Sequence, residues 1–571
     1  MTRLVRQTDR PPRRPEMTVT DVLVPSSVAV TPGETVSSSE TVSASETASS
    51  ADGLVATRQR PAVAAAPRVP RSHARAPGGP PWPLLIILAL QAALSLRLIW
   101  SNTAFADEAL YLWAGHLELA SWLHATPIPA NIDPFATYFS GAPALYPPVG
   151  AIADAYGGLA GARLLSLAFM LGATSLLYAT TLHLLRRPAA IAAAAVFAVL
   201  GPTQFLGAFA TYDAMALFLL ALAAWLAVRS RYRGGEALLV AAGLVLALAD
   251  ATKYATTLWD PAVLALAALT TVPGTWTRGV LRAARLAAYT AAPLAAALYG
   301  LGGEPYIRGI LFTTLARKAS GATASPALVL GDSLSWIWPV LALAALAVGV
   351  SFTDTPRIRM LCATCGAAAL AAPLHQAQIH TVVALYKHCG FGSWFGAIAA
   401  GYVLARAVQL CHPKGWRVVA AVAAVIVFAG LVQVNELYVA GWPDTSAVTA
   451  TLARVLPGES CPCLVMDDSV AEYYLIATLP TARYGQVTDA YFFSYWDPAR
   501  QRMTTGTGAY LRAVHDHYFR LVEIDPAQSG QLDAAVGRAL AGTPGYRRIA
   551  AYPIRNQGRG KIEIWQYEPG R

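Results

Sequence analysis

The sequence predicts a polytopic α-helical membrane protein of about eleven membrane-spanning helices that ends in an extracytoplasmic α/β domain. The 571 residues are 55% hydrophobic and only 13% charged, whereas soluble proteins have about 25% charged residues. The net charge of +10 comes from short basic clusters between apolar runs, a pattern typical of cytoplasmic loops that face anionic lipid headgroups. We therefore expect membrane lipids, and no nucleic acid, as partners.

Residues 1–80 are rich in Ser, Thr, Pro, Ala and Arg and show no apolar periodicity. Such a segment cannot bury enough apolar surface to offset the entropy of ordering, so we expect a disordered tail. No apolar stretch follows Met1 as a signal peptide requires, and this places the tail in the cytoplasm.

The transmembrane domain is predicted over 81–440, where hydropathy indicates eleven candidate spans. They are 83–100, 160–185, 189–208, 213–228, 236–252, 257–272, 284–302, 334–350, 360–374, 391–410 and 417–438. With the amino terminus inside, the connections on the cytoplasmic side hold most basic clusters, at 186–187, 229–233, 278–285, 357–359 and 414–417. An odd number of spans places the carboxyl terminus outside.

The first outer loop, 101–158, is long and aromatic and contains no Lys or Arg. Because Lys and Arg are retained on the cytoplasmic side, a loop without them belongs outside. Apolar residues at helical spacing over 107–124 predict an amphipathic helix at the membrane interface. Prolines in 126–129 and 142–148 predict a non-helical connection back to the second span.

Two adjacent carboxylates, Asp107 and Glu108, begin this predicted helix. Acidic residues in a first turn interact favourably with the helix dipole, so a capping role is the simple alternative. A partly desolvated carboxylate has a raised pKa and can act as a general base toward a hydroxyl group. Asp213, at the outer end of another span, is a second carboxylate that can converge on the same cavity.

Three cations also occur at the outer ends of spans, where they are scarce: Arg163, Lys253 and Lys387. Snorkelling to headgroups explains any one of them, whereas three together favour an anionic ligand such as a lipid phosphate. The nearby histidines lack the i, i+4 spacing of a helical metal site, so no metal or other cofactor is expected, with a divalent cation as the alternative. These histidines are His375, His380 and His388.

Past Gly441 the composition becomes that of a soluble α/β domain, 441–571. Strands are predicted at 463–466, 548–552 and 561–567, and helices at 509–517 and 527–540. Cys461 and Cys463 are only two residues apart, which predicts no ordinary disulfide between them.

Four short motifs resemble a known family. They are Asp107-Glu108, Gly161-Ala162-Arg163, Thr211-Tyr212-Asp213 and Thr252-Lys253-Tyr254. Their order over 83–440 is similar to that of the GT-C fold glycosyltransferases. Within these it is similar to glycosyltransferase family 39, which includes protein O-mannosyltransferases, lipid A aminoarabinose transferases and actinobacterial arabinofuranosyltransferases.

The resemblance implies a polyprenyl-phosphate sugar as donor and a glycan, protein or lipid as acceptor. It implies that Asp107 is the catalytic base, Glu108 its acidic neighbour and Asp213 a second active-site acid. It further implies phosphate contacts from Arg163 and Lys253. The remaining candidate substrate-binding residues are Tyr254, His375, His380, Lys387 and His388.

The predicted function is inverting sugar transfer at the outer face of a bacterial plasma membrane. A transporter or flippase for an anionic lipid or solute would equally explain the charged residues, but the two halves show no internal repeat. A sensor or scaffold that binds through its outer domain is a third alternative. The run 385–395 departs from the better-known enzymes, so the acceptor stays open, as does the sugar.

Overall fold

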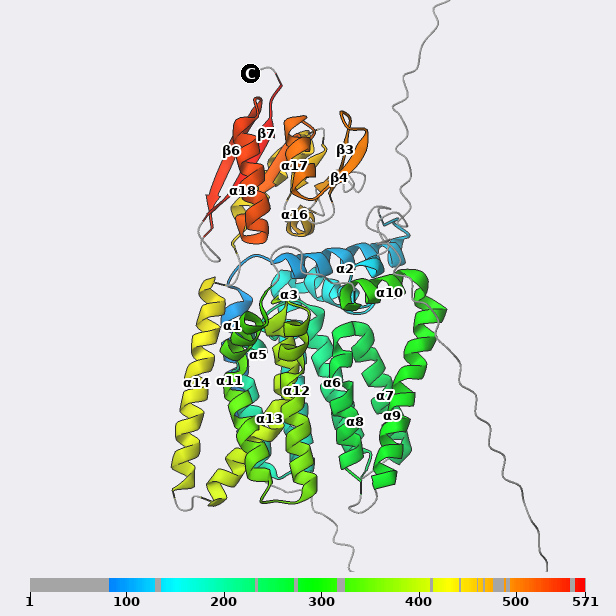
Figure 1. Cartoon of the computed structure of the whole chain (residues 1–571), viewed down its shortest axis with the longest axis vertical. Helices are drawn as coiled ribbons and strands as arrows, with labels where there is room; N and C mark the ends of the chain where they lie inside the picture. Colours follow the sequence, from blue (N-terminus) through cyan, green and yellow to red (C-terminus); the bar gives the residue numbers. More distant parts are fainter. Residues whose placement is uncertain are drawn as a thin grey trace, which may run out of the picture. The chain divides into compact units, whose positions relative to one another are not determined.

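The computed structural model describes residues 82–571, apart from gaps at 129–134, 232–234, 272–275, 316–323, 411–413, 441–442, 460, 466–467, 476–486, 489–492, 555–559 and 570–571. The predicted N-terminal tail, 1–80, lies outside the described residues. Most of the remaining chain forms a bundle of roughly aligned helices (Figure 1).

The helices of the bundle are α1 (Trp82–Ile99), α3 (Tyr146–Leu184), α4 (Arg187–Val199), α5 (Gly201–Leu206), α6 (Tyr212–Arg229), α7 (Gly235–Thr252), η3 (Tyr254–Trp259), α8 (Asp260–Leu269), α9 (Trp276–Ala297), α11 (Pro326–Ser351), α12 (Pro356–Gln378), α13 (Leu385–Leu410) and α14 (Gly415–Ala440). In the described part of the chain, eight helices are long and apolar enough to cross a membrane. The other three predicted spans overlap α4 with α5, η3 with α8, and α9, so the polytopic helical fold is confirmed.

Helix α13 is the most enclosed of the eight long helices, with 78% of its apolar 18-residue stretch buried. Buried tryptophans connect its neighbourhood across helices. Trp394 Nε1 on α13 donates to the Ala173 carbonyl of α3 at 3.0 Å, and Trp259 Nε1 on η3 donates to the Ala368 carbonyl of α12 at 3.0 Å. These bonds satisfy indole N–H groups that would be costly to bury unpaired, and they connect α13 to α3 and η3 to α12.

Helix α2 (Ala106–His124) confirms the helix predicted after the first span, and it lies across one end of the bundle (Figure 1). The expected non-helical connection is wrong over its last part. Helix α3 begins at Tyr146, with Pro147 in its first turn, and bends at Gly158, where φ is 61°. Proline fits a first helical turn because its missing N–H has no partner there in any case, so these prolines begin a helix instead of breaking one.

The same end of the bundle carries three more short elements. Between α9 and α11 lie η4 (Leu298–Gly302), α10 (Gly303–Ile310) and η5 (Leu311–Leu315), and α10 packs on η2 (Phe135–Thr137). The predicted outer loops are thus largely helical.

The C-terminal part is a five-stranded mixed sheet with helices. Its strand order is β2 (Val487–Thr488), β1 (Cys463–Val465), β5 (Leu521–Ile524), β7 (Lys561–Tyr567) and β6 (Tyr546–Pro553). β1 runs parallel to β2 and β5, whereas β7 runs antiparallel to β5 and β6. The hairpin β3 (Ser494–Asp497) and β4 (Arg502–Thr505) accompanies α15 (Ser446–Val455), η6 (Leu456–Gly458), α16 (Asp468–Leu475), α17 (Thr507–His515) and α18 (Pro526–Gly542). The predicted strands and helices all coincide with elements of this domain.

A disulfide joins Cys461 to Cys463, which corrects the expectation drawn from their spacing. Their Cα atoms are 4.7 Å apart, inside the range of about 4.4–6.8 Å that a disulfide can bridge. The chain around Pro462 bends and so brings the two residues closer than an extended tripeptide would.

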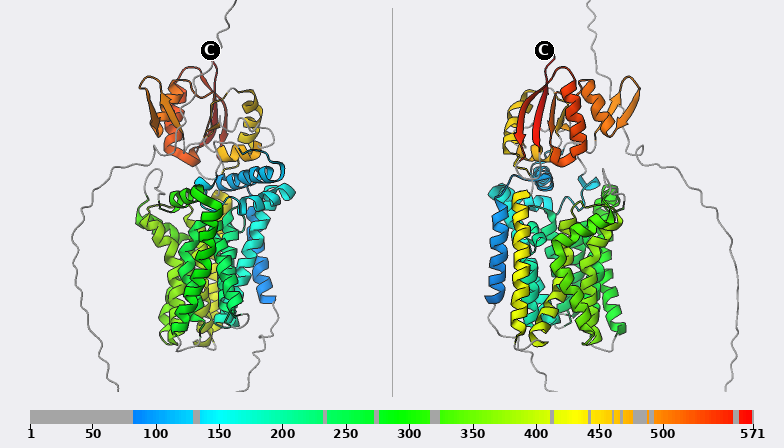
Figure 2. Two further views of the ribbon diagram at one scale, coloured as in Figure 1. Left: turned by 90° about the vertical axis from the view of Figure 1, so that its right-hand side faces the viewer. Right: turned by 60° about the vertical axis from the view of Figure 1, so that its left-hand side comes forward.

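Helix α2 lies between the bundle and the C-terminal domain (Figure 2). Helix α16 packs on α2, and both parts belong to one compact unit, Gly78–Arg571. Tyr474 Oη accepts from the Ala104 N–H at 2.7 Å. The helix that was predicted to lie at the membrane interface thus buries Tyr111 and Trp113 in protein, whereas Trp122 is exposed.

Candidate active site

Three acid–base pairs involve the start of α2, the part of α3 beyond its bend, the starts of α6 and α13, and the break after α7. They join residues that are distant in the sequence. The pairs are Glu108 with Arg163, Asp213 with Lys253, and Asp107 with Lys387. All three carboxylates predicted as catalytic, and all three predicted cations, are thus at this end of the bundle.

The Glu108–Arg163 pair is almost completely buried, with exposed side-chain fractions of 0% and 1%. Arg163 Nε and Nη2 donate to the two carboxylate oxygens of Glu108, each at 2.8 Å. The remaining N–H groups donate to the backbone carbonyls of Ile99 at 2.6 Å, Asn102 at 3.1 Å and Thr103 at 3.1 Å. Arginine has five N–H donors, and all five are engaged by the protein.

Two backbone N–H groups also donate hydrogen bonds to the Glu108 carboxylate. It accepts from the Ala210 N–H at 2.7 Å and from the Phe105 N–H, at the N-cap of α2, at 3.3 Å. The pair therefore fixes the start of α2 to α3 and to the residues before α6. This geometry does not support Arg163 as a phosphate contact, because no N–H of its guanidinium is left for a ligand.

Asp213, in the first turn of α6, pairs with Lys253 at 2.8 Å, and both side chains are buried. Asp213 Oδ2 has no hydrogen-bond partner among the described residues. Lys253 lies between α7 and η3 with an extended backbone, and its Nζ is 4.8 Å from the centre of the Tyr212 ring. This cation is thus held over an aromatic face, an arrangement that favours a desolvated ammonium.

The first outer loop holds the backbone around Lys253. Ala142 N donates to the Ala251 carbonyl at 2.8 Å, and Tyr254 N donates to the Ser140 carbonyl at 2.9 Å. A Cβ on Gly141 would lie 2.0 Å from the Thr252 oxygen, so only glycine permits this approach. The loop and the break between α7 and η3 consequently position Lys253 together.

Asp107 forms an ion pair with Lys387 at the start of α13. The Lys387 side chain is buried, with its Nζ 5.1 Å from the centre of the Phe105 ring. The Asp107 side chain is 40% exposed, whereas those of Glu108 and Asp213 are 0% and 1% exposed. Of the three carboxylates, Asp107 is therefore the one that a substrate can reach.

Tyr111 links two of the carboxylates. Its ring lies 4.3 Å from that of Tyr212, centre to centre. Burial raises the pKa of Tyr111 well above its usual value, and the negative charges of Asp107 and Asp213 raise it further. Both carboxylates are thus near enough to this phenol to affect its pKa, and their convergence on one cavity stays a prediction.

The histidines are not gathered in the same way. His388 Nδ1 lies 3.2 Å from Gln376 Oε1, His380 Nδ1 lies 3.1 Å from the Ala324 carbonyl, and His375 is exposed near the end of α12. Within the described ranges, no three His, Cys, Asp or Glu side chains are close enough to share a metal ion. Tyr254 is buried in η3, and its hydroxyl has no hydrogen-bond partner in that same part of the chain.

A second polar network was not found from the sequence. Asp154 Oδ2 lies 2.6 Å from His116 Nε2, and its Oδ1 accepts from the Tyr473 hydroxyl at 2.7 Å. Burial raises the pKa of Tyr473, and the Asp154 charge raises it further. In the sequence, Asp154 is only an acidic residue in a stretch expected to be a loop. No nearby residue indicates that its partner is Tyr473, 319 residues away.

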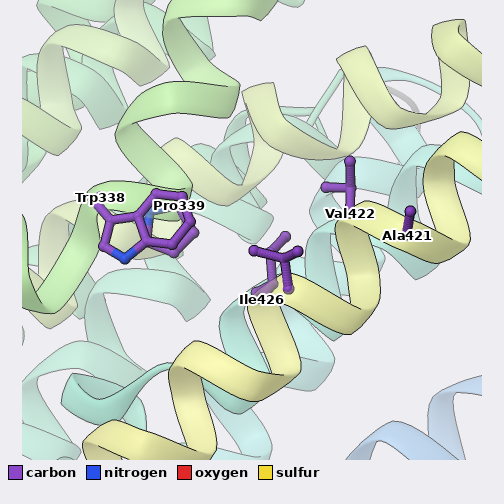
Figure 3. Close-up of a pocket in the computed structure, with 6 residues that line it drawn as sticks. Trp338, Pro339, Ala421, Val422 and Ile426 are labelled. Carbon is purple, nitrogen blue, oxygen red and sulfur yellow. The ribbon is translucent and has the colours of Figure 1, made fainter.

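An apolar groove of about 260 Å³ lies between α11 and α14 (Figure 3). It is lined by Trp338, Pro339, Ala421, Val422, Val425 and Ile426. No residue of the three acid–base pairs lines this groove, so the chemistry is not placed there.

Comparison with known proteins identifies the fold. The crystal structure of ArnT from Cupriavidus metallidurans bound to undecaprenyl phosphate matches with a TM-score of 0.53 at 13% identity, over 85% of this chain and 98% of ArnT. The oligosaccharyltransferase of Archaeoglobus fulgidus tethered with an acceptor peptide matches with a TM-score of 0.51 at 14% identity, over 84% of this chain and 73% of that one. The chain has the GT-C glycosyltransferase fold.

The GT-C fold predicted from four short motifs is thereby confirmed. No protein-family model matches the sequence, and no curated protein matches it either. At this low identity the structural matches establish the fold of the chain, and the roles of its residues rest on their own geometry.

Proposed function

We propose that this GT-C protein is an inverting glycosyltransferase that transfers a hexose or pentose from a polyprenyl phosphate to a hydroxyl acceptor. The observation that carries the proposal is the Asp107–Lys387 pair, in which a half-exposed carboxylate meets a buried ammonium at one end of the bundle. The proposed base and a proposed phosphate-binding cation are thus side by side. The match to ArnT bound to undecaprenyl phosphate supports the class of donor.

In the proposed reaction, Asp107 accepts the proton of the acceptor hydroxyl as its oxygen attacks the anomeric carbon. The bond between that carbon and the phosphate oxygen breaks on the opposite side, and its electron pair leaves with the polyprenyl phosphate. Attack opposite to the leaving group inverts the anomeric configuration. The acceptor, which is a glycan, a protein or a lipid, gains the sugar.

Lys387 and Lys253 stabilise the negative charge that grows on the leaving phosphate, which is where electrostatic catalysis has its largest effect. An ammonium has three N–H donors, so pairing with Asp107 or Asp213 leaves each lysine able to donate to phosphate oxygens. Arg163, which has no such capacity, instead positions α2. In this mechanism the lysines supply the positive charge, and no metal ion is needed.

We place the site and the C-terminal domain, 441–571, on the outer face of a bacterial plasma membrane. The Cys461–Cys463 disulfide supports this side because disulfides persist in oxidising compartments. The connections from α3 to α4, α11 to α12 and α13 to α14, where predicted cytoplasmic basic clusters lie, are at the end of the bundle opposite α2 (Figure 1). Both observations favour α2, with the catalytic first outer loop 101–158, outside.

The test is transfer by the purified full-length protein of radiolabelled sugar from a polyprenyl phosphate to a cell-envelope acceptor fraction. We expect labelled acceptor and free polyprenyl phosphate in equal amounts. Asp354→Asn, at the other end of the bundle, is the matched control for Asp107→Asn. A protein that moves the intact labelled lipid across a vesicle membrane without cleaving it would be a flippase, and the proposal would be wrong.

A further inference from the structure

Two carboxyl groups that the proposed mechanism does not use, one buried and one partly buried, lie at the break between α7 and α8. Asp250 is in the last turn of α7, and Asp260 is the first residue of α8. The intervening η3 packs on both α7 and α8 and brings the two carboxyl groups together. Asp250 is only 3% exposed.

The donors around this pair do not satisfy its oxygens. Asp250 Oδ1 accepts from the Thr256 hydroxyl at 2.7 Å. Asp250 Oδ2 and Asp260 Oδ1 are buried, and neither has a hydrogen-bond partner in the described ranges. Ionised carboxylates only accept hydrogen bonds, and two of them in contact cannot both stay charged. A proton or a cation held between them would remove this repulsion.

No side chain in the described part of the protein supplies that charge. Glu108 and Asp213, the other buried carboxylates near α2, each have a cationic partner. Lys253 is three residues from Asp250 in the sequence but is paired with Asp213. Mg²⁺ and Ca²⁺ require about six or more oxygen ligands, and no third described carboxylate, His or Cys completes a metal-binding group. A proton needs only two oxygens.

We propose that Asp250 and Asp260 hold one proton between them, as a carboxylic acid that donates to a carboxylate, and that this bound proton maintains the helix break that presents Lys253. With the proton in place, Asp250 Oδ1 accepts from Thr256. The Thr256 hydroxyl also lies 2.7 Å from the Lys253 carbonyl. The proton thus fixes the turn 250–256 from inside, while residues 140–142 hold it from outside.

The test is infrared difference spectroscopy of the full-length protein at neutral pH, comparing wild type with Asp250→Asn/Asp260→Asn. Two amides can donate to each other in place of the acid pair, so the double variant should fold. We expect the variant to lose one protonated C=O band, which shifts in D2O, and one carboxylate band. Asp354→Asn, which removes a half-buried carboxylate on the connection between α11 and α12, should lose a carboxylate band only.

Loss of two carboxylate bands, with no protonated C=O band, would overturn the proposal in favour of a bound cation. Loss of two protonated bands would overturn it in favour of two neutral acids. If the double variant does not fold, Asp260→Asn alone decides, because it should remove the protonated band. A melting temperature that rises with Na⁺, K⁺, Mg²⁺ or Ca²⁺ in wild type, but not in Asp260→Asn, would also contradict a proton at this site.

Discussion

Replacing Arg163 with alanine should destabilise the protein before it affects donor binding. The substitution removes all five hydrogen bonds of a guanidinium that is 1% exposed and leaves the Glu108 carboxylate buried without its cation. Breaking a buried pair in this way costs about 3–5 kcal/mol. That is roughly a 100- to 5,000-fold loss in the ratio of folded to unfolded protein.

The assay is thermal unfolding of purified variants in one detergent, with polyprenyl-phosphate affinity measured on the folded fraction. Arg285→Ala is the control, because Arg285 pairs with Glu236 at 3.3 Å with both side chains 50% exposed, and exposed pairs contribute little. Glu108→Ala/Arg163→Ala should lose less stability than the sum of its single variants, because the double variant leaves no unpaired charge.

One result would refute this reasoning. An Arg163→Ala protein that melts like wild type but binds polyprenyl phosphate at least tenfold more weakly would show that Arg163 holds the phosphate. The hydrogen bonds to Ile99, Asn102 and Thr103 would then not be what keeps the arginine in place.

Three further outcomes follow from the site. Asp107→Asn should abolish turnover and leave donor binding nearly unchanged in an equilibrium assay, since it removes the base but keeps the shape; full activity would exclude Asp107 as the base. Lys253→Ala and Lys387→Ala should each weaken donor binding and product inhibition roughly 10- to 150-fold. This is the equivalent of about 1.5–3 kcal/mol, the contribution of a charged hydrogen bond. The control variant Lys414→Ala should change neither quantity. Tyr473→Phe should cost about 0.5–1.5 kcal/mol of unfolding free energy. Because the folded-state pKa of Tyr473 is raised, its contribution should be present below about pH 10 and lost only as the pH rises further, which thermal unfolding from pH 7 to above 10 would detect.

The sequence predicts the elements of this fold well because their causes are local. Apolar runs indicate helices, and the alternating run 561–567 indicates a strand wherever it packs. Local rules also gave two wrong predictions. Pro147 was expected to break a helix but lies in the first turn of α3, where a proline is tolerated. The spacing of Cys461 and Cys463 argued against a disulfide, but the bend at Pro462 permits one. The strand β5 was not predicted, since Leu521–Ile524 is a short apolar run interrupted by Glu523.

Which carboxylate pairs with which cation could not be predicted from the sequence. The three cations and three carboxylates were identified, but not which of them pair. Asp107 and Lys387 are 280 residues apart, and only the tertiary fold brings the start of α2 to the start of α13. The five hydrogen bonds that occupy Arg163, which argue against a phosphate contact, were not predictable either, since the backbone carbonyls that accept them have no signature in the sequence.

The two-sided burial of α2 limits how this protein can be divided or recombined. One face of the helix carries Asp107 and Glu108 toward the bundle, while His116 reaches, through Asp154, the Tyr473 hydroxyl of α16. A chimera that exchanged only the C-terminal domain would separate Tyr473 from its acceptor and expose the apolar surface that α16 covers. A functional graft would therefore have to carry the matching face of α2 and the first turns of α3 along with the new domain.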